Sequence, residues 1–145
     1  MLLRVKGTAS PIDDQGKCKL ELEIPALYLA DANYNISLRM IMLDLHSKDN
    51  RRINIPYQFW SLSTTAVDQT AVNPMQEIAS FSRPIKLGSD YTGVVYYEPS
   101  IKREYKIQIT SIHTSEFILT AYRPDASLEI KNIEILFEIS RYARV

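Results

Sequence analysis

The chain has 145 residues, of which 46% are hydrophobic and 23% are charged, and these fractions exclude disordered, collagen-like and coiled-coil proteins. Seventeen lysines and arginines balance seventeen aspartates and glutamates, so no net charge attracts nucleic acid or an anionic membrane. A chain of this length has room for one domain with a hydrophobic core.

The first third of the chain predicts three strands. Leu2 to Lys6 alternates weakly, which predicts an edge strand. A turn-rich segment from Gly7 to Gly16 comes after it. Lys17 to Ile24 alternates strictly between apolar and charged residues, as a strand with one wet face does. A long apolar run extends from Tyr34 to Leu45. We expect one face of this third strand to carry Tyr34, Ile36, Leu38, Met40 and Met42.

The middle of the chain combines an aromatic strand with a long stretch that has no pattern. Ile53 to Leu62 is rich in aromatic residues, and Pro56 within it indicates an edge strand or a bulge. Ser63 to Gln76 is polar, contains no glycine and is about fourteen residues long. Connections of that length in a compact domain are more often functional or ordered by a partner than idle, so we predict a contact loop there.

Shorter strand signals follow. Ile78 to Arg83 predicts a strand that ends at Pro84, and Tyr91 to Glu98 predicts another after a turn. Residues 105–110 alternate again, with Tyr105, Ile107 and Ile109 on one face.

The stretch from Glu116 to Ser140 has the clearest pattern in the chain. Two arms rich in β-branched and aromatic residues flank a break at residues 123–126, which predicts a β-hairpin. The alternation in the second arm changes phase at Asn132, which predicts a β-bulge. Because a bulge bends a strand, we expect this last strand to lie at the centre of a curved, two-layered β structure.

These elements amount to eight or nine strands, with no amphipathic helix of ten or more residues. The predicted fold class is therefore all-β. Residues 1–145 are expected to form a single antiparallel β-sandwich domain, of either jelly-roll or immunoglobulin-like topology.

Residues for catalysis are few. His46 and His113 lack the second histidine or cysteine of a zinc site, and no nucleotide-binding or nucleophile motif is present. Cys18 alternates with two lysines, which predicts an inward-facing thiol and not a nucleophile. We therefore predict a protein that is not an enzyme and has no cofactor or metal.

Aromatic, loop and basic-tail residues are the remaining candidates for function, as contacts with other proteins. A basic and aromatic patch for single-stranded nucleic acid is the competing interpretation, which the zero net charge disfavours. The predicted interface residues are Tyr57, Trp60, Thr64, Thr65, Val67, Gln69, Val72, Met75, Tyr96, Arg141 and Arg144.

Three segments resemble small jelly-roll or sandwich proteins of icosahedral virions, such as minor capsid, penton or decoration proteins. These segments are residues 34–40, residues 87–91 and residues 133–139. The resemblance implies a non-enzymatic structural protein of a virus or phage particle. It would make contacts with other capsid or assembly proteins or with copies of itself, bind no small-molecule substrate, and reside in a virion assembled in the host cytoplasm.

A second resemblance supplies the alternative. Leu87 and Gly88, followed by residues 92–99, are similar to immunoglobulin-like modules of bacterial surface lipoproteins. This implies a ligand-binding or adhesive module of a bacterial surface protein. Such proteins carry a signal and a lipidated cysteine near the start, whereas Met1 to Gly16 shows neither, and no apolar run is long enough to span a membrane. We therefore rank this interpretation second.

Overall fold

The computed structural model describes residues 1–27, 34–47, 57–67, 75–84, 92–107, 109–122 and 128–141. Within these ranges the chain forms nine strands and one short 3₁₀ helix, η1. Their bounds are β1 (Leu2–Ala9), β2 (Lys17–Glu23), β3 (Tyr34–Ser47), β4 (Tyr57–Thr64), β5 (Gln76–Pro84), β6 (Thr92–Tyr97), β7 (Tyr105–Ile107), η1 (Ile109–Thr114), β8 (Phe117–Tyr122) and β9 (Leu128–Arg141).

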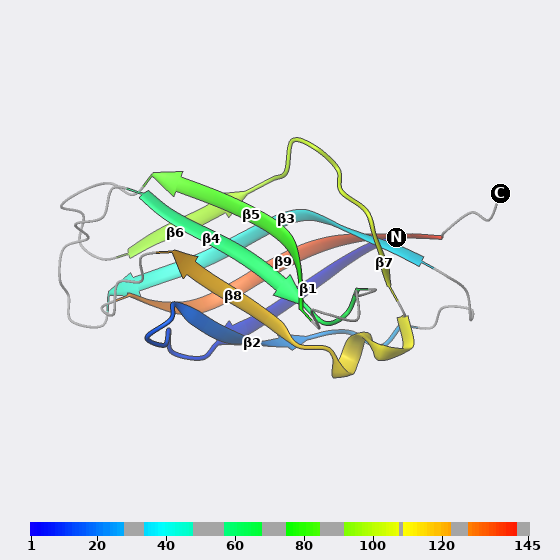
Figure 1. Ribbon diagram of the computed structural model, residues 1–145, viewed down its shortest axis with the longest axis horizontal. Coiled ribbons are helices and arrows are strands. Elements are labelled where there is room, and N and C mark those ends of the chain that lie inside the picture. Colours follow the sequence, from blue (N-terminus) through cyan, green and yellow to red (C-terminus); the bar gives the residue numbers. More distant parts are fainter. Residues whose placement is uncertain are drawn as a thin grey trace.

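The strands form one antiparallel sheet that folds over into two layers. Their order is β5-β4-β8-β2-β1-β9-β3-β6, and β7 pairs with β3 beside this path. In Figure 1 the front layer consists of β5, β4, β8 and β2, and the back layer of β1, β9, β3 and β6. The prediction of an all-β sandwich with eight or nine strands is confirmed, as a nearly closed, jelly-roll-like sheet.

Strand β9 lies at the centre of the back layer, as predicted. It pairs with β1 on one side and with β3 on the other. The predicted hairpin is wrong, because β8 pairs with β2 and β4 in the front layer and not with β9. Alternation identifies the buried face of each strand but not its partner, and these two strands face each other across the core. The rings of Phe117 and Phe137 lie 6.1 Å apart there.

The predicted bulge in β9 is confirmed. Asp44 pairs with Asn132 and Leu45 with Ile130, so Lys131 is the extra residue on β9. Lys131 and Asn132 are both exposed, whereas Ile130 and Ile133 on either side are buried. The strand therefore keeps its apolar side chains in the core on both sides of the bend.

A second bulge, in β3, was not predicted. Leu38 pairs with Phe137 and Met40 with Leu136, which leaves Arg39 as the extra residue. The buried face consequently passes from Tyr34, Ile36 and Leu38 to Ile41, Leu43 and Leu45. The expectation that Met40 and Met42 share the face of Tyr34 is wrong, and both lie half-buried on the outer side.

Four smaller predictions are also corrected. Strand β1 is not an edge strand, because it lies between β2 and β9. Strand β4 is not an edge strand either, although a bulge interrupts it between Leu62 and Ser63, and Pro56 lies outside the described residues. The ends of the predicted contact loop belong to β4 and β5. The alternation after β7 ends in η1 instead of continuing as a strand.

The two layers enclose one continuous hydrophobic core. Its largest fully buried side chains are Trp60, Phe137, Ile41, Leu43, Leu45, Leu62, Ile112, Leu119, Ile135 and Val5. At the seam, no backbone pairing joins edge strands β5 and β6 in the described chain. Instead, the rings of Phe81 and Tyr97 stack with their centroids 5.1 Å apart and an angle of 15° between their planes. The sheet is therefore closed at this place by side chains.

Within the described ranges, no helix has the length and hydrophobicity that crossing a membrane requires.

Gly7 marks the place where the sheet folds from the back layer to the front. It pairs with Ile133 of β9 and with Leu22 of β2, and a Cβ atom there would collide with the carbonyl oxygen of Glu21. Because the obstacle is backbone, we expect Gly7→Ala to lower the free energy of unfolding by about 1–3 kcal/mol. Urea denaturation measures this change. Thr8→Ala, at the exposed neighbouring position, is the control, and equal losses in the two variants would contradict the explanation.

Cys18 is inward-facing, as predicted, with an exposed fraction of 1%. Its Sγ donates a hydrogen bond to the carbonyl oxygen of Leu119 over 3.4 Å. Burial, with a smaller contribution from the nearby carboxylate of Asp13, raises the pKa of the Cys18 thiol from 9.0 to about 11. At pH 8 we expect iodoacetamide to alkylate the native protein at least about a hundredfold more slowly than the urea-unfolded protein, because two pKa units remove that much thiolate.

The same shift predicts how stability depends on pH. Since the folded thiol has the higher pKa, its contribution to stability is complete below pH 9.0 and is lost as the pH rises toward about 11. Urea titrations of the wild type and of Cys18→Ala at pH 8 and pH 10 measure the free energy of unfolding. The difference between the two proteins separates the pH-dependent contribution of Cys18 from the contributions of other titrating groups. An identical pH dependence in both proteins would argue against it.

Candidate ligand-binding surface

An exposed aromatic pair lies on the outer face of the front layer. Phe59 of β4 is directly opposite Tyr122 of β8 in the antiparallel register. Phe59 is 50% exposed and Tyr122 is 68% exposed, and their rings meet edge to face with centroids 6.4 Å apart. The strand period of two explains their position, because the neighbouring Trp60 and Ala121 point into the core. The pair is thus held by two hydrogen-bonded strands.

Hydroxyl side chains continue this surface along the same strands. Ser61 is opposite Thr120 of β8 on one side and Ser80 of β5 on the other. With the aromatic pair they line an open, shallow depression of about 430 Å³. We call this depression the aromatic platform, and its lining residues are Phe59, Trp60, Ser61, Ser80, Thr120 and Tyr122. Its described lining residues present aromatic rings and hydroxyl groups, and none of these described residues is charged.

A second depression, of about 400 Å³, lies on the outer face of the back layer. Met40, Leu136 and Tyr96 line it, with charged residues around them. These charges are already paired: Arg39 lies 3.3 Å from Glu138, and the Tyr96 hydroxyl donates a hydrogen bond to Glu98. A polar ligand would have to displace such internal partners. The aromatic platform, by contrast, offers groups that are open to a ligand.

The predicted interface residues do not gather on one surface. Trp60, Thr64 and Val67 are buried, and Thr65 is half-buried, where its Oγ1 accepts a hydrogen bond from the Glu116 amide over 2.9 Å. Met75 is half-buried as well. Those three buried side chains expose almost no area to a partner. That this set forms an interface stays a prediction.

The remaining members of the set lie apart from one another. Tyr96 is 41% exposed on the outer face of the back layer, away from the aromatic platform, and Arg141 is exposed at the end of β9. Gln69, Val72, Arg144 and the side chain of Tyr57 lie outside what the structure describes.

Sequence reasoning missed Phe59 and Tyr122, although a signal for both was present. The segment 60–63 alternates apolar and hydroxyl residues, which fixes Trp60 inside and its neighbour Phe59 outside. Likewise, Leu119 and Ala121 fix Thr120 and Tyr122 on the opposite face of β8.

The titratable side chains are not arranged for catalysis in the described part of the chain. The Nε2 atom of His46 lies 3.1 Å from Asp44 Oδ1 on the outer side of β3, whereas His113 Nε2 lies 3.1 Å from the carbonyl oxygen of Pro25. No group of three or more histidine, cysteine or carboxylate side chains is close enough to hold a metal within the described ranges.

Comparisons with known proteins give a structural likeness alone. No protein-family model matches the chain, and no curated protein matches it. Thirteen chains among the solved structures do match. One of them is a carbohydrate-binding module from glycoside hydrolase family 9 (Cel9A) of Ruminococcus flavefaciens FD-1, with a TM-score of 0.47 and 13% sequence identity. The match covers 92% of this chain and 98% of that one.

This comparison contradicts the prediction of a virion protein. The matched structure is a binding module, and nothing found supports a capsid role, capsid partners or a place in a virion. The alternative interpretation, a ligand-binding module, agrees better with it. The error arose because strand patterns report the core, which proteins of unrelated function share. At this TM-score and identity the likeness carries no argument about a ligand, which has to come from the surface itself.

The platform predicts a clear contrast between neighbouring aromatic residues. We expect Trp60→Ala to lower the free energy of unfolding by about 3–5 kcal/mol, because it empties a core site. Phe59→Ala and Tyr122→Ala should each lower it by less than about 1 kcal/mol, since cross-strand aromatic contacts contribute at most about that much. Thermal and urea unfolding of the three variants test this order. A loss in Tyr122→Ala as large as that in Trp60→Ala would contradict it.

Proposed function

We propose that residues 1–145 form a single, non-catalytic binding module that takes a carbohydrate chain on the aromatic platform. The observation that carries this proposal is the exposed Phe59 and Tyr122 pair, which adjoins a row of hydroxyl side chains and no charged residue in the described part of the chain. Exposed apolar groups in such a setting mark interaction sites in proteins.

The chemistry of a sugar suits these groups. A sugar ring has apolar C–H faces, which pack on aromatic rings, and a rim of hydroxyl groups, which exchange hydrogen bonds with serine and threonine. Ser61, Ser80 and Thr120 each offer one donor and two acceptor positions beside the rings. Contacts with two aromatic rings and a few hydrogen bonds give a modest gain in binding free energy, so we expect dissociation constants in the micromolar to millimolar range, or about −8 to −4 kcal/mol.

Two other classes of ligand fit less well. Single-stranded nucleic acid stacks on aromatic residues too, but it needs cations along its backbone, and none is among the described residues that line the platform. A protein partner needs about 20–30 residues on each side of a standard interface, whereas the described lining of the platform amounts to six.

The module found among the solved structures is described as carbohydrate-binding, which agrees with this proposal, but its TM-score of 0.47 adds no weight to it. A module with this ligand would act where polysaccharides are exposed, outside the cell. This replaces the virion as the expected location.

Binding of polysaccharides to the wild type and to platform variants tests the proposal. Affinity electrophoresis against a panel of soluble plant and microbial polysaccharides identifies a ligand, and isothermal titration with its oligosaccharide gives the affinity. We expect Phe59→Ala and Tyr122→Ala each to weaken binding at least about tenfold, which corresponds to about 1.4 kcal/mol.

Tyr96→Ala is the matched control, because it removes an exposed aromatic ring from the other layer. It should bind as the wild type does. The proposal fails if no polysaccharide in the panel is retarded, or if all three variants bind equally well.

A further inference from the structure

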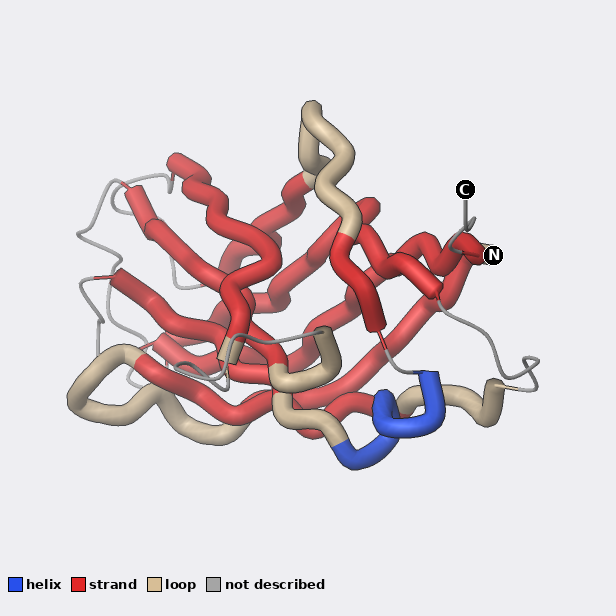
Figure 2. The backbone as a smooth tube through the Cα atoms, turned by 45° about the vertical axis from the view of Figure 1, so that its right-hand side comes forward, coloured by secondary structure: helices blue, strands red, loops and turns tan. Residues whose placement is uncertain are grey.

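A separate cavity of about 270 Å³ lies across the seam between the two edges of the sheet. One wall is β5, and the other is the segment 98–104 between β6 and β7, which stands out from the sheet in Figure 2. Leu38, Ile78 and Pro99 supply apolar walls. We call it the seam cavity. It is smaller than the roughly 300–1,000 Å³ of typical small-molecule sites, so it suits one group of a larger ligand.

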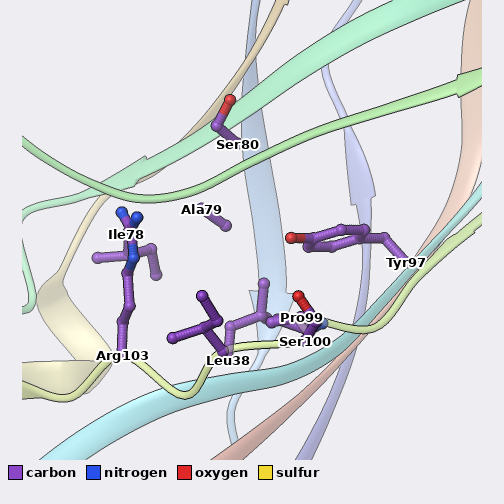
Figure 3. Close-up of a pocket in the computed structure, with 9 residues that line it drawn as sticks. Leu38, Ile78, Ala79, Ser80, Tyr97, Pro99, Ser100 and Arg103 are labelled. Atoms are coloured by element: carbon purple, nitrogen blue, oxygen red, sulfur yellow. The ribbon is translucent and has the colours of Figure 1, made fainter.

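Polar side chains reach the seam cavity from the side of β6 and the segment 98–104. Figure 3 shows the guanidinium group of Arg103 and the hydroxyl group of Tyr97 beside the same space, whereas the hydroxyl group of Ser80, on β5 above, is directed away from it. The ring of Tyr97 is held in place by its stack on Phe81. The arrangement combines a cation and a phenol beside apolar walls.

Arg103 differs from the other cations around it. Lys102, its neighbour, lies 3.1 Å from Glu104 and 3.4 Å from Glu138, and Arg39 lies 3.3 Å from Glu138. Among the residues that the structure describes, Arg103 has no such carboxylate within salt-bridge distance. Its charge is therefore available to an anion from outside the protein.

The seam cavity adjoins the aromatic platform. Ser80 lines both, because it lies on edge strand β5, opposite Ser61 of the platform. Tyr122 on β8 is two strands away from β5, a distance of about 10 Å at a strand spacing of about 4.8 Å. An oligosaccharide of a few units that crosses the platform from β8 thus reaches the edge of the sheet and the seam cavity beside it.

We propose that the seam cavity is a subsite for an anionic group on a sugar, so that the module selects acidic polysaccharides. This inference rests on the proposed carbohydrate function. The guanidinium of Arg103 matches a carboxylate with two parallel hydrogen bonds, and the hydroxyl group of Tyr97 donates to one of its remaining lone pairs. A sulfate group shares this chemistry, and the experiment separates the two.

The test compares three ligands by isothermal titration at low salt: oligogalacturonate, the same oligosaccharide with its carboxyl groups reduced to alcohols, and a sulfated galactan oligosaccharide. We expect the wild type to bind oligogalacturonate at least about tenfold more tightly than the reduced form. This preference should diminish as salt is added. The sulfated ligand shows whether the subsite takes carboxylates alone or anions in general, because it binds through Arg103 in the second case only.

Arg103→Gln should remove the preference for the acidic ligand and leave binding of the reduced ligand unchanged. Arg103→Lys should keep part of the preference for the acidic ligand, since lysine keeps the positive charge but lacks the planar guanidinium group. Lys102→Gln is the matched control, because it removes the same charge one residue away from a cation that is already paired, and it should keep the preference. Arg103 is exposed, so unchanged unfolding midpoints are expected and are checked in each variant.

The outcomes separate this inference from the function on which it rests. Equal affinity for the acidic and reduced ligands, with both weakened by Tyr122→Ala, overturns the anionic subsite and leaves the platform standing. A loss in Lys102→Gln equal to that in Arg103→Gln also overturns the subsite, since a general charge effect then explains it. Absence of binding to all three ligands overturns it too, and retention of a neutral polysaccharide in the panel then shows that the platform survives.

Discussion

The pairing of β3 with β9 is the interaction on which the rest of the structure depends. These two strands of 14 residues pair from one end to the other, β1 adds to the free side of β9, and β6 and β7 add to β3. Each strand has one bulge, at Arg39 and at Lys131, and bulges bend a strand and increase its twist. The sheet therefore curves until its far edges meet, where Phe81 stacks on Tyr97.

This way of closing gives the two outer faces different chemistry. On the back layer the charged side chains pair with one another, as Arg4 does with Glu134 and Arg39 with Glu138. Salt bridges of this exposed kind contribute little to stability, but they leave few charges for a ligand. On the front layer aromatic and hydroxyl groups lie open, and the seam beside them holds Arg103 without a carboxylate in the described chain. The features that suit binding are thus together, on the front layer and its edge.

How far the sequence predicts this fold depends on how each strand alternates. The bulge in β9 was predictable because charged residues alternate with isoleucine and change phase at Asn132. The bulge in β3 was not, because residues 40–43 are apolar on both faces and hide the change. Strand partners were beyond reach as well, since alternation gives a buried face and no neighbour. The same limit applies to the seam cavity, where Tyr97 and Arg103 lie beside β5 only because the sheet closes.

The failed virion prediction follows from the same limit. Strand spacing and apolar alternation describe the inner faces of the layers, which have to fill a core whatever the protein binds. A ligand touches the outer faces, where the period of two places the alternate residues. Phe59 and Trp60 make the difference concrete: both are aromatic neighbours in one strand, yet one is 50% exposed and the other 2%. In a two-layered β protein, function is therefore better sought in the residues on the outer faces of the strands than in the alternating apolar residues that form the core.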